Sequence, residues 1–185
     1  MDVLAHGLWG GMLAGWRKKF GLAFLFGVTP DVLAFGLWIA VRVIHGNWPR
    51  GKPNIDSIPD WVHTSYAVTH SLIIVGLIWA FLWWRRKDLA VPFSAWIIHI
   101  LFDIPSHSKD FFPTPFLYPL SDFEVSGISW GQRWFIILNY SCLLGLAILW
   151  IRARNRRETA NRLKKSQLPQ EDRSPLSRLF SKRST

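Results

Sequence analysis

The chain has 185 residues, half of them apolar, and a formal net charge of +10. Its Lys and Arg residues lie mostly between long apolar blocks and in the C-terminal tail, which is the arrangement of a membrane protein. A nucleic-acid-binding protein carries its basic residues along a groove or a helix face instead. We therefore expect membrane lipid, and no nucleic acid, as a partner.

Five apolar segments approach the roughly 20 residues that a membrane-spanning helix needs. In chain order they cover residues 3–16, 20–44, 61–84, 89–104 and 134–151. They predict an all-α fold, a polytopic membrane helix bundle with about five membrane-embedded helices. The first and fourth segments are short, so we expect them to be tilted, partly inserted or buried by their neighbours.

The connections between the segments are of two kinds. Residues 17–19 and 85–87 form tight basic turns, whereas residues 46–60 and 106–131 form long loops, the second rich in Pro and Phe. Basic connections stay in the cytoplasm under the positive-inside rule. This predicts that the tight turns and the tail are cytoplasmic, and that the N-terminus and both long loops lie outside.

The domain organisation follows from the same pattern. Residues 1–153 are expected to form a membrane-embedded helical domain that holds a candidate metal site, and residues 154–185 a basic cytoplasmic tail. The start of the tail can continue the fifth helix. Its remainder is rich in Ser, Pro and Gln, so we expect it to be partly disordered.

Several ionisable residues lie inside or beside the apolar segments, where such residues are costly and usually functional. They are His6, Asp31, His70, His99 and Asp103, with His107 just past the fourth segment. On the predicted topology they lie on four segments in the outer half or at the midplane. Agreement in depth favours one polar cavity that opens outward.

The fourth segment carries the sharpest pattern. His99, Asp103 and His107 recur at every fourth position, so on a helix they share one face, unless Pro105 ends the helix first. An imidazole and a carboxylate one turn apart can bind zinc, iron or manganese. The three residues span about 12 Å along a helix, so one ion cannot bind all of them, and other helices must supply ligands.

A simpler interpretation stands beside the metal site. His70, His99 and Asp103 can also form a neutral hydrogen-bonded network inside the bundle. Asp31 follows Pro30, so it can mark a polar kink in the second helix.

Short motifs occur in a characteristic order along residues 4–131. They are the early His6, Pro30-Asp31, Thr69-His70-Ser71, the His99-x-x-x-Asp103 helix and a Pro-rich loop at 113–120. In this order they resemble the YdjM-like family of inner-membrane metal-dependent hydrolases. That family is in turn similar to the zinc-dependent phospholipase C and single-strand nuclease group.

The resemblance implies a multi-pass protein of the bacterial cytoplasmic membrane with a divalent metal, expected to be zinc. It also implies metal-ligand roles for a set of five residues. They are His6, Asp31, His70, His99 and Asp103. The chain departs from the pattern at Leu33, where many relatives have a second Asp, and at a His-Arg-Gly element, for which the nearest residue is His63.

These observations lead to three hypotheses about function. The first is a membrane-embedded metal-dependent hydrolase that acts from the non-cytoplasmic side on a phosphoester, small-molecule or lipid-linked substrate, with His63 or His107 moving protons as catalytic residues. The second is a b-type haem protein for electron transfer, with His70 and His99 as axial ligands. The third is a non-catalytic membrane module that retains the fold, which the absence of an Asp at Leu33 favours.

Overall fold

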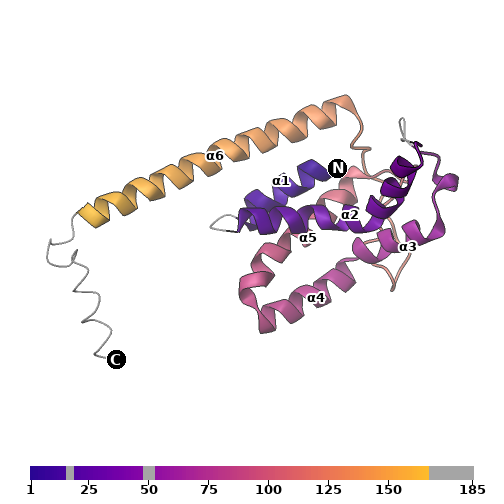
Figure 1. Ribbon diagram of the computed structural model, residues 1–185, viewed down its shortest axis with the longest axis horizontal. Coiled ribbons are helices and arrows are strands. Elements are labelled where there is room, and N and C mark those ends of the chain that lie inside the picture. Colours follow the sequence, from indigo (N-terminus) through magenta and orange to yellow (C-terminus); the bar gives the residue numbers. More distant parts are fainter. Residues whose placement is uncertain (16–18, 48–52, 167–185) are drawn as a thin grey trace. The chain divides into compact units, whose positions relative to one another are not determined.

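The computed structural model describes residues 1–15, 19–47 and 53–166. This part of the chain is all-helical and has no strand, as predicted (Figure 1). Its helices are α1 (Val3–Ala14), α2 (Phe20–Ile44), α3 (Asp60–Thr69), α4 (Leu72–Arg85), α5 (Lys87–Ser106) and α6 (Arg133–Ser166), with a short 3₁₀ turn, η1 (Ile55–Ser57). The chain forms two compact units, residues 1–146 and 147–185. The division into a membrane domain of residues 1–153 and a basic tail stays a prediction.

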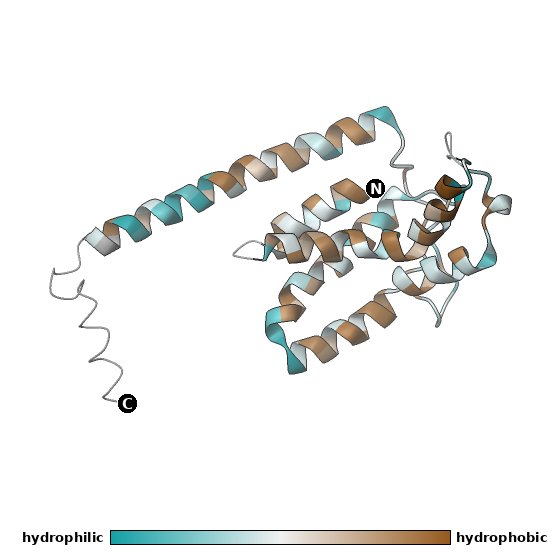
Figure 2. Cartoon of the chain, viewed as in Figure 1, coloured by the Kyte–Doolittle hydropathy of each residue, from teal (hydrophilic) through white to brown (hydrophobic). Residues whose placement is uncertain are grey.

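Three helices are long and apolar enough to cross a membrane: α2, α5 and the Arg133–Leu163 part of α6. The pair α3 and α4 passes the same test when taken as one bent span. Large apolar side chains stay exposed along these helices, for example Leu37 at 64 %, Leu77 at 69 % and Ile137 at 67 %. Apolar residues are brown along these helices in Figure 2, and exposed apolar side chains in such numbers suit lipid better than water. The fold is thus compatible with a membrane location, and the fifth span, which would need α1, stays a prediction.

The third predicted segment forms two helices rather than one. α3 ends at Thr69, and α4 begins after Ser71 at an angle of 46° to it. Ser71 has extended backbone angles, and its side chain accepts a hydrogen bond from the Ile74 N–H at 3.1 Å, which makes it the N-cap of α4. His70 therefore lies at the joint between the two helices.

Glycines let α1, α2 and α5 pack closely. A Cβ atom on Gly27 of α2 would lie 2.6 Å from the backbone oxygen of His6, and one on Gly10 of α1 would lie 2.8 Å from the Cβ of Ala95 in α5. Small residues at such crossings bring helix backbones together in membrane proteins. This packing brings His6 next to the polar face of α5.

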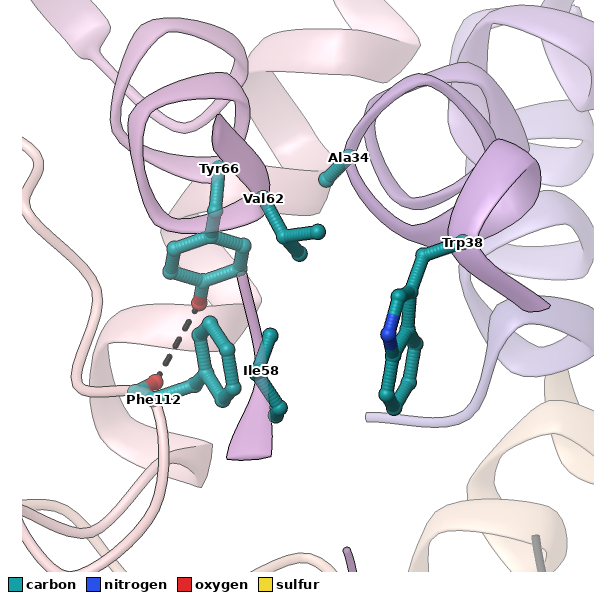
Figure 3. Close-up of a cluster of buried hydrophobic side chains, with 6 residues drawn as sticks. All are labelled: Ala34, Trp38, Ile58, Val62, Tyr66 and Phe112. Atoms are coloured by element: carbon teal, nitrogen blue, oxygen red, sulfur yellow. Dashed lines mark hydrogen bonds between the residues drawn. The ribbon is translucent and has the colours of Figure 1, made fainter. Parts of the chain in front are cut away.

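Two apolar clusters hold the remaining helices in place. The first joins α2, α3, the residue after η1 and the loop that follows α5, and it consists of Ala34, Trp38, Ile58, Val62, Tyr66 and Phe112 (Figure 3). The second joins α4 to α5 through Val75, Phe93 and Ile100. Together they fix the joint at His70 against α2 and α5.

α5 runs through Pro105 and ends at Ser106, so the helix ends just before His107, which is its C-cap and has extended backbone angles. The His107 N–H still donates to the Asp103 carbonyl at 3.0 Å. The last carbonyls of the helix are satisfied by the returning loop: those of Pro105, Ser106 and His107 accept from the N–H groups of residues 128, 130 and 127. The loop thereby holds the end of α5 and its polar face in position.

α6 extends the fifth predicted segment into the basic region, as expected, and reaches Ser166. In Figure 2 the ribbon of α6 is mostly brown and white after its first turn and mostly teal toward its end. Within the first unit, its beginning is tied to α1 because Trp9 Nε1 donates to Asn139 Oδ1 at 2.9 Å. The segment 167–185, for which disorder is predicted, lies outside the described residues.

Candidate metal centre

Four of the predicted ligands converge in one buried group. Asp31 comes from α2, His70 from the joint between α3 and α4, and His99 and Asp103 from α5. One ligand atom of each lies within 4.8 Å of the other three. His70, His99 and Asp103 are at most 1 % exposed as residues, and the Asp31 side chain is 11 % exposed. The prediction that these side chains share one pocket is confirmed, and the group can hold a metal ion.

The distances within the group suit a small ion. His70 Nε2 lies 3.1 Å from His99 Nε2, and Asp103 Oδ2 lies 3.5 Å and 3.1 Å from these two nitrogens. Asp31 Oδ1 lies 3.6 Å from His70 Nε2 and 3.8 Å from His99 Nε2. In a tetrahedral zinc site with bonds of about 2.0–2.2 Å, neighbouring ligand atoms are roughly 3.3 Å apart. Two nitrogens and two oxygens are therefore already spaced much as such a site requires.

Backbone carbonyls fix the protonation of both imidazoles. His99 Nδ1 lies 2.7 Å from the Gly27 carbonyl oxygen, and His70 Nδ1 lies 3.1 Å from the Tyr66 carbonyl oxygen. A carbonyl oxygen only accepts, so each Nδ1 carries the proton and donates. Each Nε2 then presents a lone pair to the group, which is the usual arrangement of metal-binding histidines.

The electrostatics of the group call for a cation. His70 Nε2 and His99 Nε2 lie 3.1 Å apart, so either one ring carries a second proton and donates to the other, or both lone pairs point at a shared cation, with the carboxylates of Asp31 and Asp103 beside them. Buried carboxylates are strongly destabilising unless they are paired or coordinate a metal. A divalent ion at the centre would neutralise the two carboxylate charges and accept the two nitrogen lone pairs. A mixed set of imidazole and carboxylate ligands suits zinc, iron or manganese.

His6 and His107 approach the other oxygen of Asp103. His6 Nε2 lies 2.9 Å and His107 Nε2 3.5 Å from Asp103 Oδ1, and the amino group of Met1 lies 2.6 Å from the same atom. The His6 ring also stacks on the His99 ring, with centroids 3.6 Å apart. Both residues therefore belong to the same polar cluster as the four ligands.

His107 lies just beyond the end of α5, nearer the surface than Asp103. Its side chain is 10 % exposed, and its Nδ1 lies 2.7 Å from the Phe112 carbonyl oxygen. Burial lowers the pKa of His107 below its ordinary value, which keeps the imidazole neutral near pH 7. Its Nε2 can then act as a ligand or as a proton acceptor.

Sequence reasoning missed Tyr66. Its ring stacks on the His70 ring with centroids 3.9 Å apart, and its hydroxyl lies 3.0 Å from His107 Nδ1. It also supplies the carbonyl that orients His70. Tyr66 precedes His70 by four residues, the same spacing that singled out the face of α5, and that spacing could have found it.

Two other positions lie apart from the cluster. The ring of His63 stacks on Phe112 with centroids 4.9 Å apart, and among the described residues none of the short contacts within the cluster involves it. Its catalytic role stays a prediction. Leu33 is 55 % exposed, so the position where the YdjM-like pattern has a second Asp does not line the group.

No protein-family model, curated protein or solved structure matches the chain. The resemblance to the YdjM-like family accordingly stays an expectation, based on short motifs. The geometry of the Asp31, His70, His99 and Asp103 group is thus the basis on which a function can be argued.

Proposed function

We propose that the chain is a membrane-embedded metal-dependent hydrolase that acts from the non-cytoplasmic side, with zinc as its ion. One observation carries the proposal: two imidazole lone pairs and two carboxylates are held within 4.8 Å of one another inside a helical unit with apolar outer surfaces. Such a group is costly in lipid without an ion and is a usual marker of function in membrane helices.

Some side chains of the group would bind the ion, and others would transfer protons. His70, His99 and Asp103 are fully enclosed, so they would hold the ion, with the carbonyls of Gly27 and Tyr66 orienting the two rings. A bound divalent ion polarises a phosphoryl or carbonyl oxygen and makes water a better nucleophile at neutral pH.

Proton transfer would fall to the side chains at the exposed edge. Asp31 and His107 are 11 % and 10 % exposed, in contrast to 1 % for Asp103. Either can accept a proton from the attacking water. A neutral His107 whose Nε2 has no hydrogen-bond partner among the described residues is suited to this role.

The surroundings of Asp31 support an amphipathic substrate, such as a lipid-linked phosphoester. The two residues that follow it on α2, Val32 and Leu33, are 53 % and 55 % exposed. The accessible edge of the group therefore borders an apolar helix surface. An acyl chain could lie along that surface while its polar head reaches the ion.

The geometry favours a small ion over a haem. A macrocycle between His70 and His99 would have to occupy the space that Asp31 and Asp103 fill, because both carboxylates lie within 3.8 Å of at least one of the two Nε2 atoms. A haem also has no need of two buried carboxylates beside its axial ligands.

Elemental analysis of protein purified in mild detergent without chelator tests the proposal. We expect bound zinc, and hydrolysis of a chromogenic phosphodiester or a phospholipid that is lost on chelation and restored by zinc. His99→Gln should lose both ion and activity, whereas His45→Gln, at the exposed end of α2, should keep the ion. Absence of metal in the wild type would overturn the proposal, and bound metal without hydrolysis of any ester would favour a non-catalytic module.

A further inference from the structure

α2 and α5 begin side by side, at a distance from the candidate metal centre. Lys19 is the N-cap residue of α2 and Arg86 is that of α5, and neither side chain caps its helix. Lys19 Nζ lies 3.7 Å from the carboxylate of Asp88, in the first turn of α5. Asp103 lies about 24 Å further along the axis of α5 than Lys87. The contacts at the start of these two helices are therefore separate from the metal centre.

Pro92 leaves a backbone carbonyl of α5 without its usual helical donor. Proline has no N–H, so the carbonyl of Asp88, four residues earlier, receives no hydrogen bond from position 92. The Lys19 ammonium donates to this carbonyl instead. Arg86 Nε donates to the carboxylate of Asp88 at 3.1 Å. Asp88 therefore holds two cations, one from α2 and one from the start of α5, close to each other.

This part of the structure carries more positive charge than Asp88 can neutralise. Among the described residues here, one acid faces four cations, which we call the basic cluster: Lys19, Arg85, Arg86 and Lys87. Cations are unfavourable at the start of a helix, where the helix dipole is positive. The side chains of Lys19 and Arg86 are 41 % and 62 % exposed, so an external anion can reach them. The excess charge therefore favours the binding of an anion.

The aromatic neighbours of the basic cluster indicate a membrane interface. The Arg85 guanidinium lies 5.0 Å from the ring centre of Trp84, and Lys87 Nζ lies 5.6 Å from that of Trp83. Both indole rings are exposed, at 73 % and 43 %, and Phe81, further back along α4, is 58 % exposed. Tryptophan is enriched at the level of the lipid headgroups, and its ring attracts cations. The cations thus lie beside an apolar surface that suits acyl chains.

We propose that the basic cluster binds the headgroup phosphate of an anionic phospholipid, whose acyl chains lie along the exposed apolar side of α4. The phosphate supplies the negative charge that Asp88 does not, and α4 supplies a surface that a free phosphate or an acidic peptide would leave uncovered. Basic groups at the cytoplasmic ends of membrane helices attract anionic headgroups in this way. The inference is independent of the proposed function, because the cluster lies apart from the metal centre.

Native mass spectrometry in mild detergent tests the site by counting the lipids that each chain retains. We expect the wild type to bind phosphatidylglycerol more tightly than phosphatidylcholine. Arg85→Gln/Lys87→Gln should bind phosphatidylglycerol roughly 25-fold more weakly, since each basic residue at an anionic lipid surface contributes about fivefold. Arg152→Gln/Arg156→Gln removes the same charge from exposed positions of α6 and should bind as the wild type does. Circular dichroism establishes that each variant is folded.

The outcomes that would overturn the site are distinct. Equal affinity of the wild type for the two lipids would show that headgroup charge is not recognised. Equal losses in the two double variants would show that only net charge attracts the lipid. Displacement of phosphatidylglycerol by an equal concentration of inorganic phosphate would make this a site for the free anion. If Arg85→Gln/Lys87→Gln does not fold, Lys87→Gln alone provides the measurement, with binding about fivefold weaker.

A chelator separates this inference from the proposed function. With chelator present throughout, no ion at the metal centre can hold a lipid, so any retained phosphatidylglycerol is bound elsewhere. Metal content is measured on separate samples without chelator and should be the same in both double variants and the wild type. Absence of metal would therefore overturn the proposed function and leave the lipid site intact.

Discussion

Asp103 is the residue on which the cluster converges. Its side chain is 1 % exposed, and its two oxygens approach four imidazoles and one amino group. A carboxylate at the centre of a membrane helix costs about 3 kcal/mol on insertion scales. Such a residue is tolerated only where it is paired or coordinates a metal, so a cation in the cluster would explain why this position carries an acid.

Asp103→Asn should weaken ion binding without unfolding the protein. The amide keeps the shape of the side chain, but it is neutral and a much poorer ligand than a carboxylate. We expect a large loss of bound metal by elemental analysis, with helical circular dichroism retained. Asp88→Asn, at the exposed beginning of the same helix, removes the carboxylate that pairs with Arg86 at 3.1 Å and should leave the metal content unchanged. Higher thermal stability of Asp103→Asn with full metal content would show that Asp103 is only a buried charge.

The residues of the cluster were predictable to the extent that their side chains are unusual in apolar segments. His70, His99, Asp103 and Asp31 stand out because ionisable groups are rare at membrane depth. Tyr66 does not stand out, since tyrosine is common in membrane helices. The Gly27 carbonyl could not be predicted at all, because a backbone oxygen has no signature in the sequence.

At the scale of elements, the joint between α3 and α4 was missed for a physical reason. Residues 61–84 are mostly apolar and contain no Pro, so their overall hydropathy favours one span, although the polar stretch Thr69-His70-Ser71 interrupts them at the joint. The break is held instead by the distant loop, where the Leu72 N–H donates to the Phe116 carbonyl at 2.9 Å and Ser71 Oγ donates to the Tyr118 carbonyl. Contacts between residues more than 40 positions apart cannot be seen in a local pattern.

Gly27→Ala should destabilise the helix packing around the cluster. The added Cβ would lie 2.6 Å from the His6 carbonyl oxygen, so α1 has to shift. We expect a loss of roughly 1–3 kcal/mol, the usual cost of overpacking, together with weaker metal binding because His6 and His99 both contact this region. Thermal unfolding in detergent and elemental analysis measure the two effects.

Gly21→Ala is the matched control in the same helix. Nothing lies within 4 Å of a Cβ atom built there. Alanine is the better helix former by up to about 1 kcal/mol, so stability should be equal or higher. Equal stability of both variants would contradict the close packing of α1 on α2.

At the scale of the whole molecule, the apolar outer surfaces and the buried polar cluster form a pattern that is the reverse of a soluble enzyme's. Leu77 and Ile137 are among the most exposed large apolar residues, whereas His70 and His99 are fully enclosed. The all-α class and three of the predicted spans were evident from hydropathy. The number of spans was harder to predict from hydropathy, because length alone cannot distinguish a short buried helix such as α1 from one that crosses the membrane.

Reporter fusions test the predicted orientation in the membrane. Fusions after Lys19 and Arg86 should report a cytoplasmic position, because basic connections stay inside. A fusion near Pro115, in the loop that returns to the end of α5, should report the opposite side. Alkaline phosphatase and a fluorescent protein, active on opposite sides, provide the two readouts. A cytoplasmic signal at Pro115 would place the centre's opening on the cytoplasmic side.

The position of His70 at the helix joint has a mechanical consequence. The Tyr66 carbonyl oxygen accepts hydrogen bonds from both the backbone N–H of His70, at 2.9 Å, and its Nδ1, at 3.1 Å, so the imidazole ring is fixed to the end of α3. Binding of an ion to His70 Nε2 would therefore be coupled to the angle between α3 and α4. Because such coupling is reciprocal, loading the centre should stiffen the 46° bend, and any force that straightens α3 and α4 should loosen the ion.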